Sequence, residues 1–364
     1  MITKSLYFKL SNYFSMNLFD STLKGDESVF LDETALDFEY LPHIIKYREN
    51  QQKYIAECIK PLFQQRNGKN LLVTGSPGIG KTAATKFVLR ELEEKGLDEE
   101  IFPIYINCWK KDTAYKIVLE ICDKLKYKFT QGKHTSELIK DITKLLNKKP
   151  VVLVLDEVDK LQDMQILYLI LEDLNKKTLI LITNELEFLS NIDNRIRSRL
   201  IPEFLEFKPY NFEETYGILK QRVDYGFAKN IFNENALRLI SEKTHEKADI
   251  RSGIYLLKET GLIAENESSK LILESHALRA IEKLKDIKIE SSEKRKNTFL
   301  NLIKENSGKT CFELFTLYRQ MGGKKSYKTF TRRINILVDK GFATKKEIQV
   351  GTGKSSIIEY NLKI

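Results

Sequence analysis

The sequence predicts an α/β protein: a parallel sheet with helices on both faces, then a small helical module, then a C-terminal module of three helices and a β-hairpin. Three observations lead to this prediction. Apolar strand-like runs alternate with helical patterns up to about residue 208, which is typical of a parallel sheet. Only helical patterns occur from there to about residue 288. Beyond residue 296, three helical patterns precede two β-like runs around a glycine-containing turn.

Four short apolar runs are expected to form the sheet. The third is almost continuously apolar, which indicates a strand covered on both faces. The expected strands are residues 70–75, 101–108, 150–159 and 178–184. The spacing of apolar residues predicts helices around them, at residues 47–63, 81–96, 113–127, 136–148 and 164–174.

The rest of the chain divides by composition and pattern. Residues 1–45 are expected to be an irregular arm with an acidic middle, and the charged stretch 293–297 is expected to be a linker or a helix start. The helical module contains four expected helices, at residues 211–227, 233–246, 249–266 and 273–286. We therefore expect four parts: an arm (1–45), a sheet domain (46–208), a helical domain (209–290) and a C-terminal domain (291–364).

The 364-residue chain carries a formal net charge of +9, and its basic residues are concentrated at the end. Residues 294–364 contain 16 Lys and Arg against 5 Asp and Glu, a net charge of +11, so the other residues together carry −2. A local positive field of this kind suits a polyanion, with nucleic acid favoured over a membrane surface. A basic stretch can also be a solvated surface, and charge alone does not decide between the two.

Composition argues against a membrane or secreted protein. No run of about 18 apolar residues is present to span a bilayer, and the first residues lack the continuous apolar stretch of a signal peptide. The four cysteines show no CxxC spacing, so we expect buried free thiols in a reducing cytosol; they are Cys58, Cys108, Cys122 and Cys311. The expected location is the cytoplasm.

Residues 75–82, GSPGIGKT, match the phosphate-binding pattern G-x-x-x-x-G-K-[ST]. The run follows an expected strand and opens an expected helix, which is the context that this chemistry needs. Glycines let backbone N–H groups turn toward phosphate oxygens, and a helix N-terminus adds unpaired N–H groups. We expect Lys81 to bind the outer phosphates and the Thr82 hydroxyl to join a Mg²⁺ shell. The expected nucleotide-binding loop is Gly75, Ser76, Pro77, Gly78, Ile79, Gly80, Lys81 and Thr82.

Two acids, Asp156 and Glu157, end the third expected strand. A carboxylate at the carboxyl end of a neighbouring parallel strand faces the same crevice as the phosphate loop. We expect Asp156 to orient Mg²⁺ and Glu157 to polarise the attacking water in phosphoryl transfer. The same pair also fits two exposed acids of a turn.

The fourth expected strand ends in Thr183-Asn184, and an Arg-rich run follows it. The neutral amide of Asn184 can align a water molecule or contact a terminal phosphate, although a strand-ending Asn is often turn chemistry. An arginine after the last strand can reach a neighbouring subunit's nucleotide and neutralise transition-state charge. Such arginines also occur as solvated or ion-paired surface residues; those of this run are Arg195, Arg197 and Arg199.

The third helix of the C-terminal module, residues 326–341, has two distinct faces by its 3.6-residue period. One face is apolar and carries Tyr327, Phe330, Ile334, Leu337 and Val338. The other carries residue types that bind base edges or phosphates in a major groove, and the hairpin adds lysines. The expected DNA contacts are Lys328, Arg332, Arg333, Asn335, Lys345, Lys346 and Lys354. Such a module, a winged helix, can instead bind protein and leave a solvated basic face.

Five motifs, in this order, resemble the AAA+ ATPase superfamily: GSPGIGKT, LVLDEVD, LITN, RIRSRL and ADIRSG. The finer resemblance is to the archaeal single-chain form of the origin-recognition and cell-division-control initiators, over about residues 18–364. It rests on IYINC, on SRL and on the terminal module. The resemblance implies a P-loop AAA+ nucleotide-binding domain, a helical lid and a C-terminal winged-helix DNA-binding domain.

The resemblance also implies ATP or ADP and Mg²⁺ as cofactors. At the matching positions, Lys81 and Thr82 would bind phosphate and metal, and Asp156 would serve the metal. Glu157 would be the catalytic base, and Asn184 would be the first sensor.

Three arginines gain roles from the resemblance alone. Arg251 on a lid helix would be the second sensor, which reports the γ-phosphate to the lid, and Arg199 would be the finger offered to an adjacent subunit. Arg48 begins an Arg-Glu pair that matches the family's pair before the first helix and would lie at the nucleotide. The family usually has Gly-Asp before the sensor arginine, where this chain has Ala248-Asp249; the Asp can still cap the helix.

We therefore expect an ATP-dependent DNA-binding replication initiator that recognises double-stranded origin DNA. ATP binding and slow hydrolysis would switch its grip on DNA or its recruitment of partners, such as a replicative helicase and other initiator subunits. Two alternatives remain: a clamp-loader-like AAA+ ATPase, and a P-loop nucleotide-switched transcription or signalling regulator with a winged helix. No motif in the sequence selects adenine over guanine.

Overall fold

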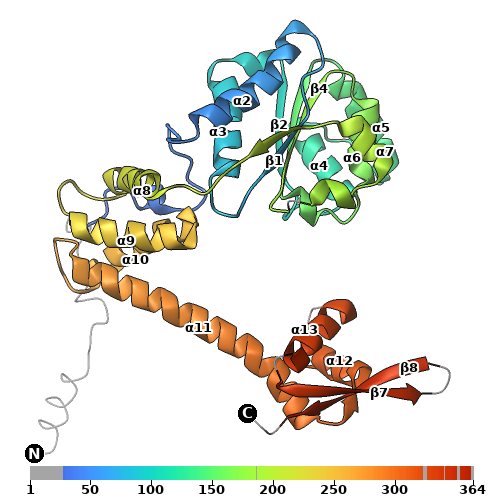
Figure 1. Cartoon of the computed structure of the whole chain (residues 1–364). Helices are drawn as coiled ribbons and strands as arrows, with labels where there is room; N and C mark the ends of the chain where they lie inside the picture. The colour runs from blue at the N-terminus through green and yellow to red at the C-terminus, as the bar shows by residue number, and fades with distance from the viewer. Residues whose placement is uncertain (1–27, 186, 323–325, 340, 351–352, 362–364) are drawn as a thin grey trace, which may run out of the picture. The chain divides into compact units, whose positions relative to one another are not determined.

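The structure is a computed structural model of the whole chain (Figure 1). It describes residues 28–185, 187–322, 326–339, 341–350 and 353–361, and the structural statements below concern these residues. The chain forms two compact units, Met1–Ile281 and Glu282–Ile364. The first contains the sheet and the helical module, and the second contains the C-terminal module.

The first unit is built on a five-stranded parallel sheet with the order β2-β3-β4-β1-β5 (Figure 1). Its strands are β1 (Leu71–Thr74), β2 (Phe102–Asn107), β3 (Val151–Asp156), β4 (Lys177–Ile182) and β5 (Glu203–Glu206). The four expected strands are confirmed. The sequence reasoning missed β5, because the side chains of this edge strand are alternately half-buried and exposed and lack the continuous apolar run of a central strand.

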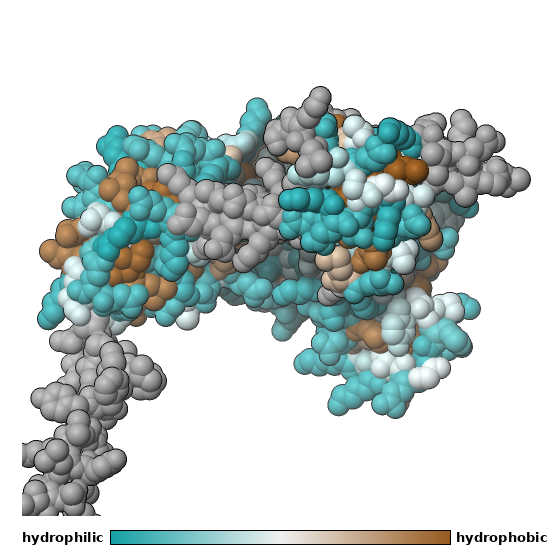
Figure 2. Space-filling model, turned by 90° about the horizontal axis from the view of Figure 1, so that it is seen from below, coloured by the Kyte–Doolittle hydropathy of each residue, from teal (hydrophilic) through white to brown (hydrophobic). Residues whose placement is uncertain are grey.

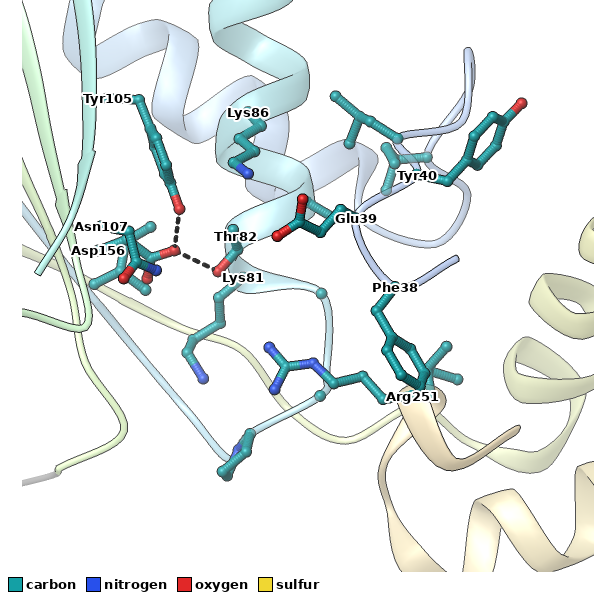
Figure 3. A pocket seen from close by; sticks show the side chains of 18 of the residues that line it. Phe38, Glu39, Tyr40, Lys81, Thr82, Lys86, Tyr105, Asn107, Asp156 and Arg251 are labelled. Carbon is teal, nitrogen blue, oxygen red and sulfur yellow. Dashed lines mark hydrogen bonds between the residues drawn. The ribbon is translucent and has the colours of Figure 1, made fainter. Parts of the chain in front are cut away.

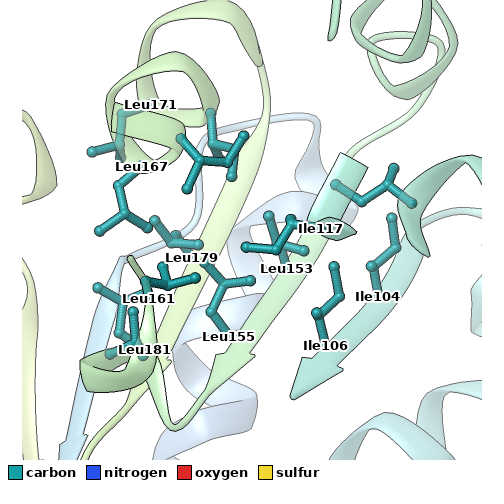
Figure 4. Packing of buried hydrophobic residues seen from close by; sticks show 14 of the residues in the cluster. Ile104, Ile106, Ile117, Leu153, Leu155, Leu161, Leu167, Leu171, Leu179 and Leu181 are labelled. Atoms are coloured by element: carbon teal, nitrogen blue, oxygen red, sulfur yellow. The ribbon is translucent and has the colours of Figure 1, made fainter. Parts of the chain in front are cut away.

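Helices cover both faces of the sheet, because successive side chains of a strand point to opposite faces. Leu153 and Leu155 of β3 pack with the helices on one face, and Val152 and Val154 pack with the helices on the other. Figure 4 shows the first of these cores. The helices are α2 (Glu49–Ile59), α3 (Lys81–Glu94), α4 (Ala114–Lys124), α5 (Thr135–Leu146), α6 (Gln165–Asp173) and α7 (Asn194–Leu200). The five expected helices are confirmed, and α7 contains the Arg-rich run.

The helical module, called the lid below, consists of α8 (Phe212–Gly226), α9 (Glu234–Lys247), α10 (Ile250–Asn266) and the start of α11. Side-chain caps begin its helices. Asn211 forms a capping box at α8, Asn233 caps α9, and Asp249 caps α10 as expected. Short 3₁₀ helices elsewhere in the first unit are Glu33–Leu36, Lys60–Gln64, Leu97–Glu99, Val158–Lys160 and Phe188–Asn191.

Residues 28–46, which we call the strap, join the lid to the sheet domain. At the lid end, the Val29 N–H donates to Glu265 Oε1 at 3.0 Å. The buried Arg222 of α8 donates to two strap carbonyls, and Arg90 of α3 donates to three more near the sheet domain. The sequence reasoning expected only an irregular arm here, and the remainder of that arm, residues 1–27, lies outside the described residues.

One continuous helix, α11 (Glu274–Glu305), leads out of the lid. The sequence reasoning expected two helices, separated near residues 293–297, and this expectation is wrong. The segment contains no Gly or Pro, and Glu, Lys and Arg are good helix formers. A stretch of charged residues therefore does not end the helix.

The second unit contains α11 from residue 282, α12 (Cys311–Gln320), α13 (Tyr327–Asp339) and an antiparallel sheet of order β6-β8-β7. Its strands are β6 (Lys309–Thr310), β7 (Ala343–Val350) and β8 (Gly353–Tyr360). This is the expected arrangement of three helices and a hairpin, with the short β6 as an addition. Val350 pairs with Gly353; residues 351 and 352 of the expected turn lie outside the described residues.

The core of the second unit confirms four of the five residues expected on the apolar face of α13: Phe330, Ile334, Leu337 and Val338 belong to it or pack against it, whereas Tyr327 is 44% exposed. Phe330 and Ile334 are fully buried, together with Phe299 of α11 and Leu314 of α12. The first unit and this one each have their own hydrophobic core. Lys328 and Arg332 are thus left on the opposite, exposed face.

Among the residues that the structure describes, no helix is both long and apolar enough to span a bilayer. The four cysteines are buried free thiols, as expected. Figure 2 shows one face on which hydrophilic residues predominate and small hydrophobic groups are scattered between them.

Candidate nucleotide-binding site

Three neighbouring strands, β1, β4 and β3, end at one edge of the sheet, and a cavity of about 600 Å³ lies there. The phosphate loop follows β1, the two acids end β3, and Asn184 follows β4. The acids, Asn184 and the loop residues Pro77, Gly78, Gly80, Lys81 and Thr82 line the cavity, whereas Gly75, Ser76 and Ile79 of the loop do not, and Arg251 contributes from the lid. Figure 3 shows Lys81, Thr82, Asp156 and Arg251 around the same space. The structure thus brings together the loop, the acids, the amide and the lid arginine that the sequence singled out.

The glycines of the phosphate loop are needed for their backbone angles and for close contacts. Gly75, Gly78 and Gly80 have φ values of +141°, +75° and +91°, which residues with a Cβ rarely adopt. A Cβ on Gly78 would also meet the Asp249 carboxylate of the lid. The Ile250 N–H of α10 donates to the Gly78 carbonyl at 3.1 Å. The lid and the loop are therefore in direct contact.

Lys81 begins α3, and its ammonium group turns back toward the loop. Nζ donates to the carbonyls of Gly75 and Ser76, each at 2.7 Å, and to Asn184 Oδ1 at 2.8 Å. The residue is only 6% exposed, and burial lowers the pKa of Lys81 to about 8 against the opposing effect of Asp156. Lys81 therefore links the loop to the end of β4 through neutral acceptors.

Asp156 is the buried carboxylate of the site, 2% exposed. Its Oδ2 accepts hydrogen bonds from the hydroxyls of Thr82 and Tyr105, each at 2.7 Å, and its Oδ1 accepts one from the Glu157 N–H at 2.9 Å. The sequence reasoning placed Thr82 and Asp156 in one site and missed Tyr105. The available signal was its position on the strand next to β3, two residues before Asn107.

Glu157 lies just beyond β3 in the left-handed conformation, with φ 55° and ψ 44°. A positive φ in a residue of this size is uncommon and often marks a functional position. Burial raises the pKa of Glu157, and the neighbouring Asp156 raises it further. The carboxylate is thus a better proton acceptor than an exposed one.

The side chains of this cavity fit a magnesium triphosphate. Mg²⁺ prefers oxygen ligands and commonly takes one or two protein oxygens beside phosphates, and the Thr82 hydroxyl and the Asp156 carboxylate lie side by side. The N-terminus of α3 and the ammonium of Lys81 suit an anion. The cavity volume is also within the usual range for ligand sites.

Arg251 lies in the first turn of α10, exposed at the cavity. Its N–H donates to Asp249 Oδ1 at 3.0 Å. Ala248, which stands where the family usually has Gly, takes the left-handed conformation with φ 50° and ψ 35°. The chain therefore keeps the glycine-like geometry before α10 at a strain of about 1 kcal/mol.

Arg48 lies beneath the phosphate loop and does not line the cavity. It is 4% exposed. Its guanidinium donates to the Ile79 carbonyl at 2.9 and 3.2 Å and to the Lys208 carbonyl at 2.7 Å, and it stacks on Tyr210 at 3.7 Å. The sequence reasoning placed Arg48 among the nucleotide-binding residues. The structure instead makes it a link between the loop and the segment that leads to the lid.

The strap supplies apolar side chains to the cavity, which the sequence reasoning missed. Phe38 and Ile44 line it and are 60% and 58% exposed. Apolar and aromatic side chains of this kind suit the ring of a nucleobase. No local pattern in residues 28–46 indicated this, because the contacts that position the strap come from the lid and α3.

Arg199 of α7 lies outside this cavity. Its Nε donates to Glu172 Oε2 at 2.6 Å, and its guanidinium lies 4.8 Å from the ring centre of Tyr168. The nearby Arg195 pairs with Asp193. Within one chain Arg195 and Arg199 are therefore ion-paired surface residues, and they do not complete the chain's own site.

The expected DNA contacts lie in the second unit. Lys328, Arg332 and Asn335 are exposed on α13. Arg333 is half-buried, with its guanidinium 5.3 Å from the ring centre of Phe299. The first three residues thus share one open surface of this helix, whereas Arg333 packs on the core.

The lysines of the hairpin differ in their partners. Lys345 Nζ donates to Asn335 Oδ1 at 3.5 Å, which places β7 next to α13. Lys346 pairs with Glu359 across the hairpin at 2.8 Å. The side chain of Lys354 lies outside the described part of the structure.

Comparison with known proteins places this architecture in a family. A model of the AAA domain matches residues 64–192, and a model of the Cdc6 AAA+ ATPase-type lid domain matches residues 216–282. Among solved structures, the Aeropyrum pernix ORC1 protein in complex with DNA aligns with a TM-score of 0.69 and 22% identity, over 93% of this chain and 95% of that one. Cdc6p from Pyrobaculum aerophilum aligns with a TM-score of 0.64 and 18% identity, over 92% and 95%. These likenesses confirm the fold class of AAA+ domain, lid and C-terminal winged helix.

Sequence relatives match over most of their length. ORC1-type DNA replication protein 1 of Archaeoglobus fulgidus is 30% identical over 345 residues, 89% of this chain and 84% of the relative. The protein of the same name from Sulfolobus acidocaldarius is 31% identical over 335 residues, 86% and 83%. With this identity over most of both chains, together with the AAA+ and Cdc6-type lid matches, this chain belongs to the ORC1-type DNA replication proteins of the AAA+ ATPase superfamily.

Proposed function

We propose that this protein is a replication initiator that binds double-stranded origin DNA under the control of ATP. The observation that carries the proposal is the convergence of Lys81, Thr82, Asp156 and the lid residue Arg251 on one cavity. The names of the relatives support it, since they are DNA replication proteins and the Aeropyrum ORC1 protein was solved in complex with DNA. The nucleotide would act as a switch, and its Mg²⁺-dependent hydrolysis would be slow.

The loop, Lys81, Thr82 and the two acids then each have a chemical role. The loop N–H groups and Lys81 would hold the outer phosphates, and Thr82 with Asp156 would hold Mg²⁺. When bound, Mg²⁺ neutralises negative charge on the phosphate oxygens. Glu157, with its raised pKa, would orient the attacking water and accept its proton. Water activation is thereby assigned to the end of β3, and phosphate binding to the loop that follows β1.

Two residues would report the presence of the terminal phosphate. Asn184 accepts from Lys81 Nζ, so a phosphate that draws Lys81 away would free the amide. Arg251 lies in the first turn of α10, next to Ile250, whose N–H donates to the Gly78 carbonyl of the loop. Movement of the loop would therefore be passed to the lid directly.

We propose the following division of the chain. Residues 1–45 are an arm, 46–208 bind nucleotide, 209–290 are the lid and 291–364 bind DNA. Because α11 is continuous across residue 290, the last boundary lies within a helix. An initiator on DNA would recruit a replicative helicase and other initiator subunits, and its DNA binding would hold it at the nucleoid in the cytoplasm.

Arg199→Ala is expected to lower ATP turnover only where subunits associate, because Arg199 lies outside its own chain's cavity. We expect wild-type turnover per subunit to rise with protein concentration and the variant to stay at the dilute value, a difference of about 10-fold or more. Turnover is measured over a concentration series, with Arg195→Ala as the control on the same helix. Equal turnover of wild type and Arg199→Ala at high concentration would mean that this arginine does not act between subunits.

Duplex binding is expected to weaken steeply with salt. The exposed face of α13 carries Lys328 and Arg332, and the unit around it is strongly basic. A protein with about six phosphate contacts loses about 1,000-fold in affinity between 50 and 200 mM salt. Fluorescence anisotropy of a labelled duplex measures this dependence. Lys328→Ala should reduce the slope of the logarithm of affinity against the logarithm of salt concentration by about one. A flat salt response would contradict DNA binding through this face.

Footprinting separates the proposed function from its two alternatives. An initiator should protect repeated sites at an origin, independently of any promoter, and more strongly with ATP than without it. A transcription regulator should protect promoters, and a clamp-loader-like ATPase should show no preference for a duplex sequence. Protection confined to promoters would therefore contradict the proposal.

A further inference from the structure

Tyr105 of β2 is bonded to the same carboxylate oxygen as Thr82. Its hydroxyl donates to Asp156 Oδ2 at 2.7 Å, the distance at which Thr82 Oγ1 also donates to that atom. Figure 3 shows the two bonds converging. Oδ1 accepts from the Glu157 N–H at 2.9 Å. Three donors, from β2, from α3 and from the segment after β3, therefore fix the orientation of the Asp156 carboxylate.

The strand register puts Tyr105 within reach of Asp156. In the parallel pair β2–β3, Tyr105 lies opposite Val154 and Asn107 lies opposite Asp156. Because side chains alternate, Tyr105 and Asn107 share one face of the sheet. The Lys86 ammonium of α3 lies 4.6 Å from the Tyr105 ring centre, which favours this position of the ring. Tyr105 is thus held on its face as well as at its hydroxyl.

The hydroxyl of Tyr105 matters most once a cation is bound. Mg²⁺ requires near-octahedral geometry at 2.0–2.1 Å, so it is sensitive to the orientation of its ligands. A cation held by both Thr82 and Asp156 would weaken the hydrogen bond between them. Tyr105 would then remain as the side-chain donor that fixes Oδ2. Hydrogen-bond partners of metal ligands are commonly worth 10- to 100-fold in metal affinity.

We propose that Tyr105 is a positioning residue for magnesium: its hydroxyl keeps Asp156 in the orientation in which Asp156 and Thr82 bind Mg²⁺ together with the nucleotide. The inference rests on the nucleotide site proposed above and adds a residue to it. It differs from a packing role, because a phenylalanine ring would fill the same space without the donor.

Tyr105→Phe tests the proposal, since it removes one oxygen and keeps the ring beside Lys86. The full-length wild type and variant are titrated with a fluorescent ATP analogue in EDTA and at a series of Mg²⁺ concentrations. In each protein, Mg²⁺ is expected to increase the affinity for the ATP analogue. We expect the Mg²⁺ concentration that produces half of this increase to be about 10-fold higher or more in the variant than in the wild type. Affinity in EDTA should stay unchanged, because the loop and Lys81 are untouched.

Tyr54→Phe is the matched control. The Tyr54 hydroxyl also donates to a carboxylate of the sheet domain, Glu203 Oε2, at 3.1 Å, and neither residue lines the cavity. We expect this variant to respond to Mg²⁺ as the wild type does. An equal rise in both variants would overturn the inference, because general loosening of the domain would then be the cause.

The remaining outcomes distinguish the inference from the proposed site. A wild type whose nucleotide affinity does not respond to Mg²⁺ would contradict the site itself. A wild type that responds, with Tyr105→Phe responding at the same Mg²⁺ concentration, would overturn only the inference. Should the Phe variant fail to fold, Tyr105→Met is measured with the same expectations, because Met lacks the donor and adapts to irregular space.

Discussion

Glu157→Gln is expected to bind ATP as tightly as the wild type and to hydrolyse it at least about 100-fold more slowly. The amide keeps the shape of the side chain and can still hydrogen-bond a water molecule, but it cannot accept the proton. General bases commonly contribute 10²- to 10⁴-fold, and the raised pKa of Glu157 fits this role. Equilibrium binding of a fluorescent ATP analogue and single-turnover hydrolysis measure the two effects separately.

Glu185→Gln is the control for this substitution. Glu185 is an exposed acid one residue beyond Asn184, and it does not line the cavity. Its replacement should leave both binding and hydrolysis near the wild-type values. Hydrolysis at the wild-type rate by Glu157→Gln would remove the assignment of this residue as the base.

Lys81→Ala is expected to weaken ATP binding by about 100-fold. The substitution removes a buried ammonium group that lies at the start of α3 and at the edge of the cavity. Hydrogen bonds to charged groups contribute about 1.5–3 kcal/mol each, so the loss of a single such bond already costs 10-fold or more. Calorimetric or fluorescence titration with ATP and Mg²⁺ measures the change.

Two further measurements make the Lys81 result specific. Lys95→Ala changes a lysine at the other end of the same helix, exposed and paired with Glu91, and should bind ATP normally. Because Lys81 Nζ also donates to two loop carbonyls, the thermal unfolding of the variant is recorded without nucleotide. Normal ATP affinity in a folded Lys81→Ala protein would exclude Lys81 from the phosphate site.

The central sheet could be predicted from the sequence because its strands are buried on both faces. Residues 151–156 are apolar up to Asp156 and fully buried, and β1 and β4 behave alike. A parallel strand that is buried on both faces is apolar on both sides, so it appears in the sequence as a short continuous apolar run. β5 escaped detection for the opposite reason, since its exposed face carries Glu206 and Phe204.

Long-range contacts limited what the sequence could predict elsewhere. The strap is positioned by Arg222 and Arg90, which lie far away in the chain, and its own residues show no helical or strand period. The continuity of α11 was missed because a run of charges was interpreted as a break. Charge by itself does not end a helix when Gly and Pro are absent.

The candidate site shows the same division. Lys81, Thr82 and Asp156 were predicted because phosphate chemistry fixes both their residue types and their local context. Arg48 and Tyr105 act through partners that only the fold brings near, the Ile79 carbonyl and the Asp156 carboxylate. Their positions follow from tertiary packing and strand register, which no sequence period records.

The phosphate loop and the acids at the end of β3 are expected to bind one magnesium triphosphate, and the roles proposed for the other residues of the site depend on this. Isothermal calorimetry of the purified, nucleotide-free protein with ATP, in the presence and absence of Mg²⁺, tests this claim most directly. We expect one ATP bound per chain, with Mg²⁺ tightening the binding and with Asp156→Asn losing the Mg²⁺ effect. No heat of ATP binding in the presence of Mg²⁺, from protein that is folded, would contradict the claim.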